Sequence, residues 1–439
     1  MSIEEIPGTD LKYGLISFDA DGQERARPSG LMSQILIDKA RDDTITNVFF
    51  FCHGWKGDLP AAKDQYGRWL KALVSSPDMS RASHVFPNFK PLFVGLHWPS
   101  QPWGDEELRG GGAFGGAGGL SADALLDAYL DQLGDRPAVR TPLQIIIDEA
   151  RTNAAPDELP PHIRQAYLDL NDALGLGSDG VAAPPDADRE GFDPDESYEA
   201  GNDEGRDFGG GLDLGGILGP LRQLSYWTMK KRARTIGEGG MHHFLKVLQQ
   251  ATALTRTRIH LMGHSFGTIV VSGMLAGPNA TGTLPRSVDS TVLVQGAVSL
   301  WSYATAIPFR NAGAGYFNPV LADGKISGPL VITRSRHDNA VGKLYPLASR
   351  IKGSAAFAPE AFPEYGAMGA FGIQGLAGGV GADSNMLPAS GTYNFQRSKV
   401  YNLDGSQFIA KKEGISGAHS DVAGPEVAHV IWEAAFASA

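Results

Sequence analysis

The sequence predicts an α/β protein in which helices flank a mostly parallel central sheet. Several short segments are apolar at nearly every position, as strands are when both faces of a parallel sheet are covered. Amphipathic segments with a helical period stand between them. These elements recur along almost the whole chain, although a length of 439 residues alone favours two or three domains. We therefore expect one core domain, residues 1–100 and 223–439, interrupted by an insertion at 101–222.

The first hundred residues contain three expected strands separated by two helices. Residues 13–18 alternate, which indicates an opening strand, and residues 31–41 have a helical period. Residues 48–52 are wholly apolar and predict a central strand, which an amphipathic helix at 61–73 follows. Residues 91–98 predict a third strand.

The second half of the core continues the alternation. A long helix is expected at 226–252, and the apolar strand that follows it at 258–262 leads into a buried helix at 268–275. Two further strands are predicted at 328–334 and 399–403. This order of elements is typical of a parallel sheet with crossover helices.

The insertion at 101–222 begins after Pro99, which ends the third strand, and opens with a glycine-rich tract at 110–116. Three helices are expected in it, at 122–133, 143–151 and 163–174. Ligands of parallel sheets bind beyond the carboxyl ends of the strands. A segment that leaves the sheet there predicts a cap, or lid, over a binding site.

Residues 178–215 are rich in proline, glycine and acidic side chains. They hold twelve acidic residues and two arginines, so most of the chain's net charge of −11 lies in this stretch. Such composition predicts a solvated, poorly ordered surface loop. A calcium site is the alternative, although the acids lack the spacing of an EF-hand.

Two further segments allow more than one interpretation. The basic run 230–234 predicts the solvent face of a helix, with a phosphate or acidic-lipid contact as the alternative. Residues 353–396 are rich in glycine, alanine and aromatic residues and stand between the expected last two strands. They either wall a pocket or form a packed excursion.

Composition narrows the class of protein. The acidic balance argues against nucleic acid as a partner, because phosphate binding requires basic patches. No segment resembles a signal peptide or an integral membrane span. The single cysteine, Cys52, excludes an internal disulfide and is expected to be a buried thiol in a cytoplasmic protein; export without a cleaved signal stays open. No metal-ligand spacing such as H-E-x-x-H occurs, so neither a metal nor a cofactor is expected.

The segment Gly263-His264-Ser265-Phe266-Gly267 carries the clearest chemical signal. It is a G-x-S-x-G motif between an expected strand and an expected helix, the setting of a nucleophile elbow. A serine on such a tight turn points out of the sheet, and the helix N-terminus behind it favours developing negative charge. Ser265 is therefore the expected nucleophile.

The chain supplies partners for this serine in the order Ser265, Asp338, His419. Asp338 follows the strand at 328–334, and His419 follows the last expected strand. An imidazole titrates near neutral pH and can take the serine proton, while an aspartate holds its tautomer. His337 is the rival base because it adjoins Asp338.

The loop His53-Gly54-Trp55 follows the apolar segment 48–52. In proteins with a nucleophile elbow, such a loop supplies one oxyanion-hole amide, and the residue after the nucleophile supplies the other. We assign these amides to Trp55 and Phe266.

The segments FFFCHGW, VGLHWPS, HLMGHSFG, VITRSRHD and SGAHSD together resemble serine hydrolases of the α/β-hydrolase superfamily, in particular bacterial esterase- and lipase-like members. The resemblance spans about residues 45–100 and 226 to the C-terminus. It implies hydrolysis of small-molecule or lipid carboxylic esters, or thioesters, through an acyl-enzyme on Ser265. Amidase, peptidase and acyltransferase activities use the same machinery, and a non-catalytic binding or scaffold protein on this fold is the alternative from another class. No protein partner is indicated.

Overall fold

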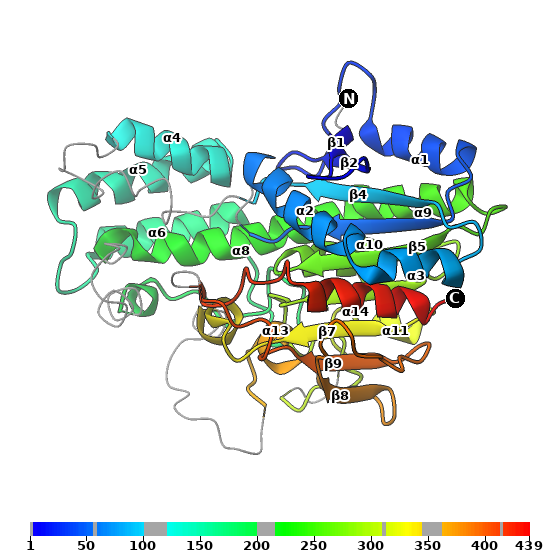
Figure 1. Ribbon diagram of the computed structural model, residues 1–439. Helices are drawn as coiled ribbons and strands as arrows, with labels where there is room; N and C mark the ends of the chain where they lie inside the picture. Colours follow the sequence, from blue (N-terminus) through cyan, green and yellow to red (C-terminus); the bar gives the residue numbers. More distant parts are fainter. Residues whose placement is uncertain are drawn as a thin grey trace.

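The computed structural model describes residues 3–55, 59–100, 121–199, 216–309, 313–344, 362–412 and 416–439. Its centre is a nine-stranded sheet in the order β1-β2-β4-β3-β5-β6-β7-β9-β8, parallel except for β1 (Figure 1). The strands are β1 (Ile3–Glu5), β2 (Lys12–Ser17), β3 (Asn47–Cys52), β4 (Pro91–His97), β5 (Arg258–His264), β6 (Ser290–Val294), β7 (Leu330–Arg334), β8 (Gly381–Asn385) and β9 (Val400–Asp404). The predicted α/β class with a mostly parallel sheet flanked by helices is therefore confirmed.

Each strand predicted from an apolar or alternating segment forms close to its expected bounds, whereas β1, β6 and β8 were not predicted. β8 has the sequence GADSN and is exposed at all five positions. It carries no hydrophobic pattern, and its pairing with the edge strand β9 is a tertiary event that the pattern does not encode. β8 gives the excursion at 353–396 a strand, although residues 353–361 lie outside the described part.

Helices cover both faces of the sheet and build two cores. They are α1 (Met32–Asp42), α2 (Leu59–Val74), α3 (Pro77–Val85), α4 (Ala122–Leu133), α5 (Pro137–Thr152), α6 (Pro161–Leu174), α8 (Gly219–Ile236), α9 (His242–Ala251), α10 (Gly267–Ala276), α11 (Asn318–Ala322), α13 (Met368–Phe371) and α14 (Pro425–Phe436). On β3, Phe50 joins the core under α1, α9 and α10, while Phe49 and Phe51 join the core under α2, α3 and α14. Cys52 is buried at the end of that strand, as predicted.

The three helices predicted in the insertion form as α4, α5 and α6. Figure 1 shows them grouped with the first part of α8, to one side of the sheet. α8 passes from this group to the face of the sheet, so the insertion and the core share one helix. The glycine tract at 110–116 lies outside the described residues.

The long helix predicted at 226–252 is interrupted. A π-helical turn, η3 (Gly237–Met241), separates α8 from α9. The turn packs closely on α10, and a Cβ at Gly237 would stand 2.6 Å from the carbonyl oxygen of Val270. The glycine therefore permits a backbone approach that a regular amphipathic pattern does not encode.

The predictions for the acidic stretch and the basic run are wrong where the structure describes them. Residues 178–199 are folded, and Asp186 and Asp188 are buried. Arg234 donates to both carboxylate oxygens of Asp186, at 2.5 and 2.9 Å, while Asp188 accepts the Ala182 amide at 2.7 Å. Lys230 is fully buried, which lowers its pKa to about 8. Opposite charges far apart in the sequence face each other. The acidic segment alone does not indicate that Arg234 is its partner, and the basic segment alone does not indicate Asp186. Residues 200–215 lie outside the described part.

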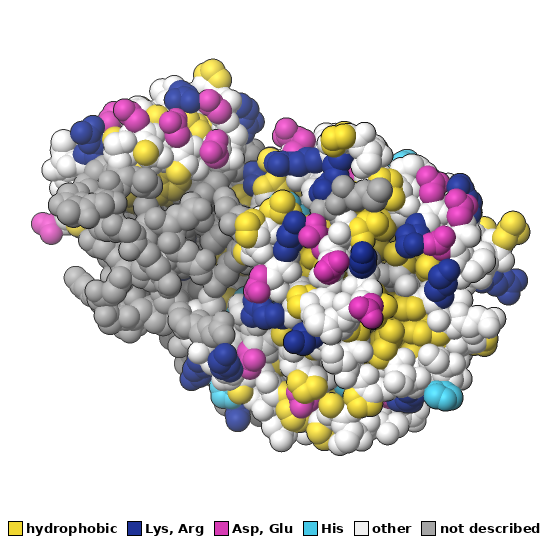
Figure 2. Space-filling view, turned by 45° about the horizontal axis from the view of Figure 1, so that its top comes forward, with side chains coloured by type: hydrophobic (Ala, Val, Ile, Leu, Met, Phe, Trp, Pro, Cys, Tyr) yellow, Lys and Arg dark blue, Asp and Glu magenta, His cyan; other side chains and the backbone are white. Residues whose placement is uncertain are grey.

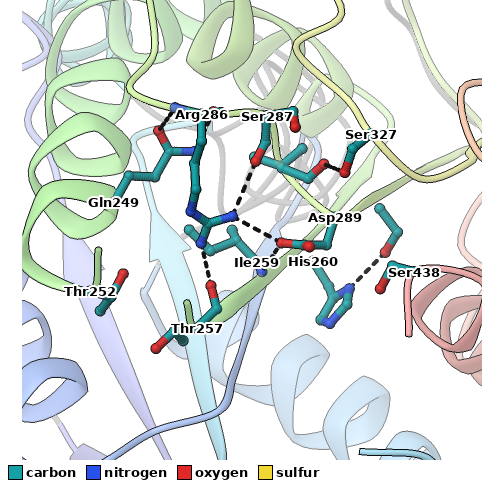
Figure 3. A network of polar contacts seen from close by, with 12 residues as sticks. Gln249, Thr252, Thr257, Ile259, His260, Arg286, Ser287, Asp289, Ser327 and Ser438 are labelled. Atoms are coloured by element: carbon teal, nitrogen blue, oxygen red, sulfur yellow. Dashed lines mark hydrogen bonds and ion pairs between the residues drawn. The ribbon is translucent and has the colours of Figure 1, made fainter. Parts of the chain in front are cut away.

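A polar network ties the amino ends of β5 and β6 together, at the edge opposite the carboxyl ends of the parallel strands (Figure 3). The Arg286 guanidinium donates to Asp289 at 3.2 Å and to the carbonyl of Thr257. Asp289 in turn accepts the Ile259 amide at 2.8 Å, and Gln249 donates to the Arg286 carbonyl at 2.8 Å. These contacts satisfy backbone groups at the start of β5.

The surface in Figure 2 mixes basic and acidic side chains, with apolar patches between them. Within the described ranges, no helix combines the length and the apolar composition that crossing a bilayer requires.

Candidate active site

Ser265 occupies the turn between β5 and α10. Its φ is +55°, a left-handed conformation that costs a non-glycine residue about 1–2 kcal/mol. The turn is held from both sides: the Ser265 amide donates to Val294 at 3.1 Å, and its carbonyl accepts the Ala297 amide at 3.2 Å and the Thr268 hydroxyl at 2.6 Å. The strained turn predicted from the G-x-S-x-G motif is present.

The glycines around Ser265 are required by close backbone contacts. A Cβ at Gly263 would stand 2.6 Å from the Gly267 carbonyl, and one at Gly267 would stand 2.3 Å from the Cys52 carbonyl. A Cβ at Gly54 would lie 2.4 Å from the Ser265 Cβ. The loop after β3 therefore touches the serine itself.

Ser265, His419 and Asp338 are brought together from three distant parts of the chain. The His419 Nε2 lies 2.7 Å from the Ser265 Oγ, and its Nδ1 lies 2.7 Å from the Asp338 Oδ2. Because a carboxylate only accepts, Nδ1 carries the proton and Nε2 is left to accept from the serine hydroxyl. All three residues are buried, with exposures of 3%, 7% and 2% respectively.

The loop that carries His419 is fixed against the loop after β7. Asp338 and Gly417 form an antiparallel bridge, and the Ala418 amide donates to the His337 carbonyl at 2.8 Å. The ring of His264, the second residue of the G-x-S-x-G motif, donates from Nε2 to the His419 carbonyl at 2.8 Å. His264 thereby positions the imidazole next to it in space.

His337, the rival base, is placed differently. Its ring contacts the Arg336 side chain, whose Nε lies 3.4 Å from the His337 Nε2, and its own backbone carbonyl holds Ala418. The imidazole that contacts Ser265 is that of His419.

Gln295 belongs to the site but was missed from the sequence. Its Nε2 donates to the Asp338 Oδ2 at 2.8 Å, and the Val341 amide donates to Oδ1 at 3.2 Å. Gln295 follows β6, which was not predicted, and a polar residue directly after the apolar run Val292-Leu293-Val294 is the signal that could have found it.

The peptide between Gly54 and Trp55 has a fixed orientation. The Gly54 carbonyl faces the His53 Nδ1 at 2.8 Å and accepts the Ser100 hydroxyl at 3.0 Å. The Trp98 amide donates to His53 Nε2 at 3.4 Å, so the ring is a neutral tautomer, and burial lowers the His53 pKa to about 3. Since a trans peptide is planar, the Trp55 N–H points away from these donors.

Phe266, the second expected oxyanion donor, stands at the N-terminus of α10, where amides have no partner within the helix. Its ring lies 5.6 Å from that of Trp55 and 5.0 Å from that of Tyr226, measured between centroids. These three rings form an aromatic cluster beside Ser265, to which α8 contributes Tyr226. Residues 56–58 lie outside the described part.

Within the described part of the chain, one group of side chains has the spacing of a metal site: Asp78, His429 and Glu433. Each already has protein partners. His429 lies 2.6 Å from Asp78 and 3.0 Å from the Gly391 carbonyl, and Arg81 pairs with Glu433. The guanidinium supplies the positive charge that a cation would bring, so we interpret this group as a structural contact between α3 and α14.

Comparisons of the chain with models of protein families, with curated proteins and with solved structures found no match. We therefore infer the chemistry of this protein from the geometry of its site.

Proposed function

We propose that this chain is a serine hydrolase with an α/β-hydrolase fold, and that it cleaves carboxylic esters through an acyl-enzyme on Ser265. The observation that carries the proposal is the continuous relay from the Ser265 hydroxyl through His419 to Asp338, with 2.7 Å at each step. A serine is a weak nucleophile until an adjacent base accepts its proton. The strained turn and the relay are costly features that a purely structural serine does not require.

In the proposed reaction, His419 Nε2 takes the Ser265 proton as Oγ attacks the ester carbonyl. The tetrahedral oxyanion is stabilised by the amides of Trp55 and Phe266, and a donor of this kind contributes about 3–4 kcal/mol. His419 then protonates the departing alkoxide, which leaves an acyl ester on Ser265. A water molecule, deprotonated by the same ring, cleaves that ester and restores the serine.

We further propose that the helical group of α4, α5, α6 and the first part of α8 acts as a cap. α8 supports this proposal, because it carries Tyr226 from that group into contact with Phe266. Such a cap would shape the acyl-binding wall and exclude water from it. Lipid and thioester substrates are within the same chemistry.

The test is labelling with a fluorophosphonate, which phosphonylates an activated serine. The wild-type chain should label and hydrolyse short-chain esters, and Ser265→Ala should do neither while keeping its thermal transition. Ser272→Ala is the matched control, because Ser272 lies on α10 with its hydroxyl bonded to the Thr268 carbonyl at 2.6 Å. Labelling that persists in Ser265→Ala would exclude this serine as the nucleophile.

A further inference from the structure

Gln295 holds a strained backbone at the carboxyl end of β6. Its φ is +48° and it is completely buried, between the strand that bears Ser265 and the strand that precedes Asp338. The backbone N–H of Gln295 donates to Thr333, to its carbonyl at 3.3 Å and to its hydroxyl at 3.2 Å. A left-handed non-glycine residue in a buried site points to a requirement for its side chain there.

Thr333 and Asp338 fix the orientation of the Gln295 side-chain amide. The Thr333 hydroxyl donates to Oε1 at 3.3 Å, which places the NH₂ group toward Asp338. His419 Nδ1 and Gln295 Nε2 both donate to the same oxygen, Asp338 Oδ2, at 2.7 and 2.8 Å. The other oxygen receives the Val341 amide.

We propose that Gln295 is a positioning residue: it fixes the Asp338 carboxylate for His419 and limits how strongly that carboxylate attracts the imidazole proton. The inference rests on the proposed function. A hydrogen bond to a charged acceptor stabilises the charge on it. The Gln295 side-chain amide and the Val341 N–H are neutral donors that stabilise the negative charge of Asp338. They therefore weaken the attraction of that charge for the proton on His419.

Among the described residues, the other titratable groups on the elements that adjoin the pair include His264, His337 and Arg336. From β5, His264 lies 4.9 Å from His419 between ring centroids and bonds to its carbonyl. From the loop after β7, His337 and Arg336 contact each other. α13 packs beside β7 and has the sequence MGAF, with no titratable group. Gln295 is thus the side chain, besides His419, that the described structure shows bonded to the Asp338 carboxylate.

Loss of the Gln295 donor has two consequences. The unshared Asp338 charge holds the proton on His419 more firmly, so the neutral base forms only at higher pH. The carboxylate also loses a contact that fixes its rotamer, which lowers kcat. KM should not change, because Gln295 contacts Asp338 rather than any group that faces substrate.

The experiment compares the pH dependence of ester hydrolysis and of the fluorophosphonate labelling rate in the wild type and three variants. In Gln295→Met, which keeps size but removes the donor, the acidic limb should move up by about 0.5–1 pH unit and kcat should fall about tenfold, with KM unchanged. Gln295→Glu should move the limb up at least as far, because a second carboxylate beside Asp338 adds negative charge near His419. Ser272→Ala, which removes a buried hydroxyl bonded to the Thr268 carbonyl and to Tyr303 rather than to the Asp338–His419 pair, should leave the limb where it is.

The outcomes separate the alternatives. Rates are compared only at pH values where circular dichroism shows each variant to be folded, so acid unfolding cannot account for a displaced limb. If the wild type is labelled and Gln295→Met has the same pH profile, the positioning role is overturned. An equal displacement of the limb in Ser272→Ala would overturn it as well. A wild type that neither labels nor hydrolyses esters would overturn the proposed function, and this role with it.

Discussion

At the scale of single residues, several positions of the site are strained or closely packed. Ser265 and Gln295 both have positive φ, and each is held by backbone bonds from a neighbouring strand. Gly54 lies so close to Ser265 that no side chain fits between them. We therefore expect small substitutions at these positions to lower activity while they leave the rest of the molecule intact.

Replacement of Gly54 by alanine should abolish activity. The added methyl would stand 2.4 Å from the Ser265 Cβ and 3.0 Å from its Oγ, so the serine or the loop must shift. We expect kcat/KM to fall by more than about 100-fold, since misplacement by about 1 Å has that cost. Gly239→Ala is the control, because a Cβ there has open space. Comparable losses in both variants would contradict the steric argument.

His419→Ala and Asp338→Asn should each reduce ester turnover by orders of magnitude, because each interrupts the relay to Ser265. Their effects should not add in the double variant, since the residues act as one unit. The measurement is kcat for the two single variants and the double variant. If His337→Ala were more damaging than His419→Ala, the base would have to be reassigned.

At the scale of elements, residues 178–199 of the acidic stretch are a packed part of the fold rather than a solvated loop. Through Asp186 it pairs with Arg234 on α8, and Arg234 also reaches Glu238 in η3 at 3.5 Å. Glu238 accepts the Tyr316 hydroxyl at 2.7 Å. The stretch is thus joined to the helix that links the insertion to the core.

Asp186→Ala should destabilise the protein by about 3 kcal/mol, because it leaves the Arg234 guanidinium partly buried without its main partner. Glu199→Ala, at an exposed position of the same stretch, should change the free energy of unfolding by less than about 0.5 kcal/mol. Chemical denaturation of both variants measures the difference. Equal stabilities would return the stretch to the role of a surface loop.

At the scale of the whole molecule, buried histidines connect stability to pH. Burial lowers the pKa of His53 and of His260 to about 3 in the folded state. Unfolded histidine titrates near about 6.5, so between these values the unfolded chain binds more protons. The contribution of each neutral ring to the free energy of unfolding is therefore fully present above about pH 6.5 and is lost as the pH falls toward 3.

This linkage predicts that each ring contributes about 1 kcal/mol per pH unit to the slope of stability between pH 6 and pH 4. His260→Gln should lower overall stability, because it disturbs contacts to Asn47 and Ser290, but it should flatten that slope. Urea unfolding of both proteins across this range is the measurement. Parallel slopes would show that His260 does not charge on unfolding.

Local sequence determined much of this protein. Apolar runs located the strands that carry Cys52, His264 and Arg334, because a buried parallel strand must be apolar on both faces. The glycines and serine of the G-x-S-x-G motif predicted the turn, since only small residues permit its close contacts. The order Ser265, Asp338, His419 predicted which side chains meet. Their hydrolytic role stays a prediction.

Tertiary structure alone decided the rest. β8 has no hydrophobic pattern and forms on the edge of β9, and Asp186 and Arg234 are neutralised by each other across 48 positions of sequence. Gln295 reaches Asp338 only because β6 lies between β5 and β7 in the sheet. A periodic pattern reports which face of an element is buried, but it does not report which distant element covers that face. Strand order and charge pairing depend on that second fact.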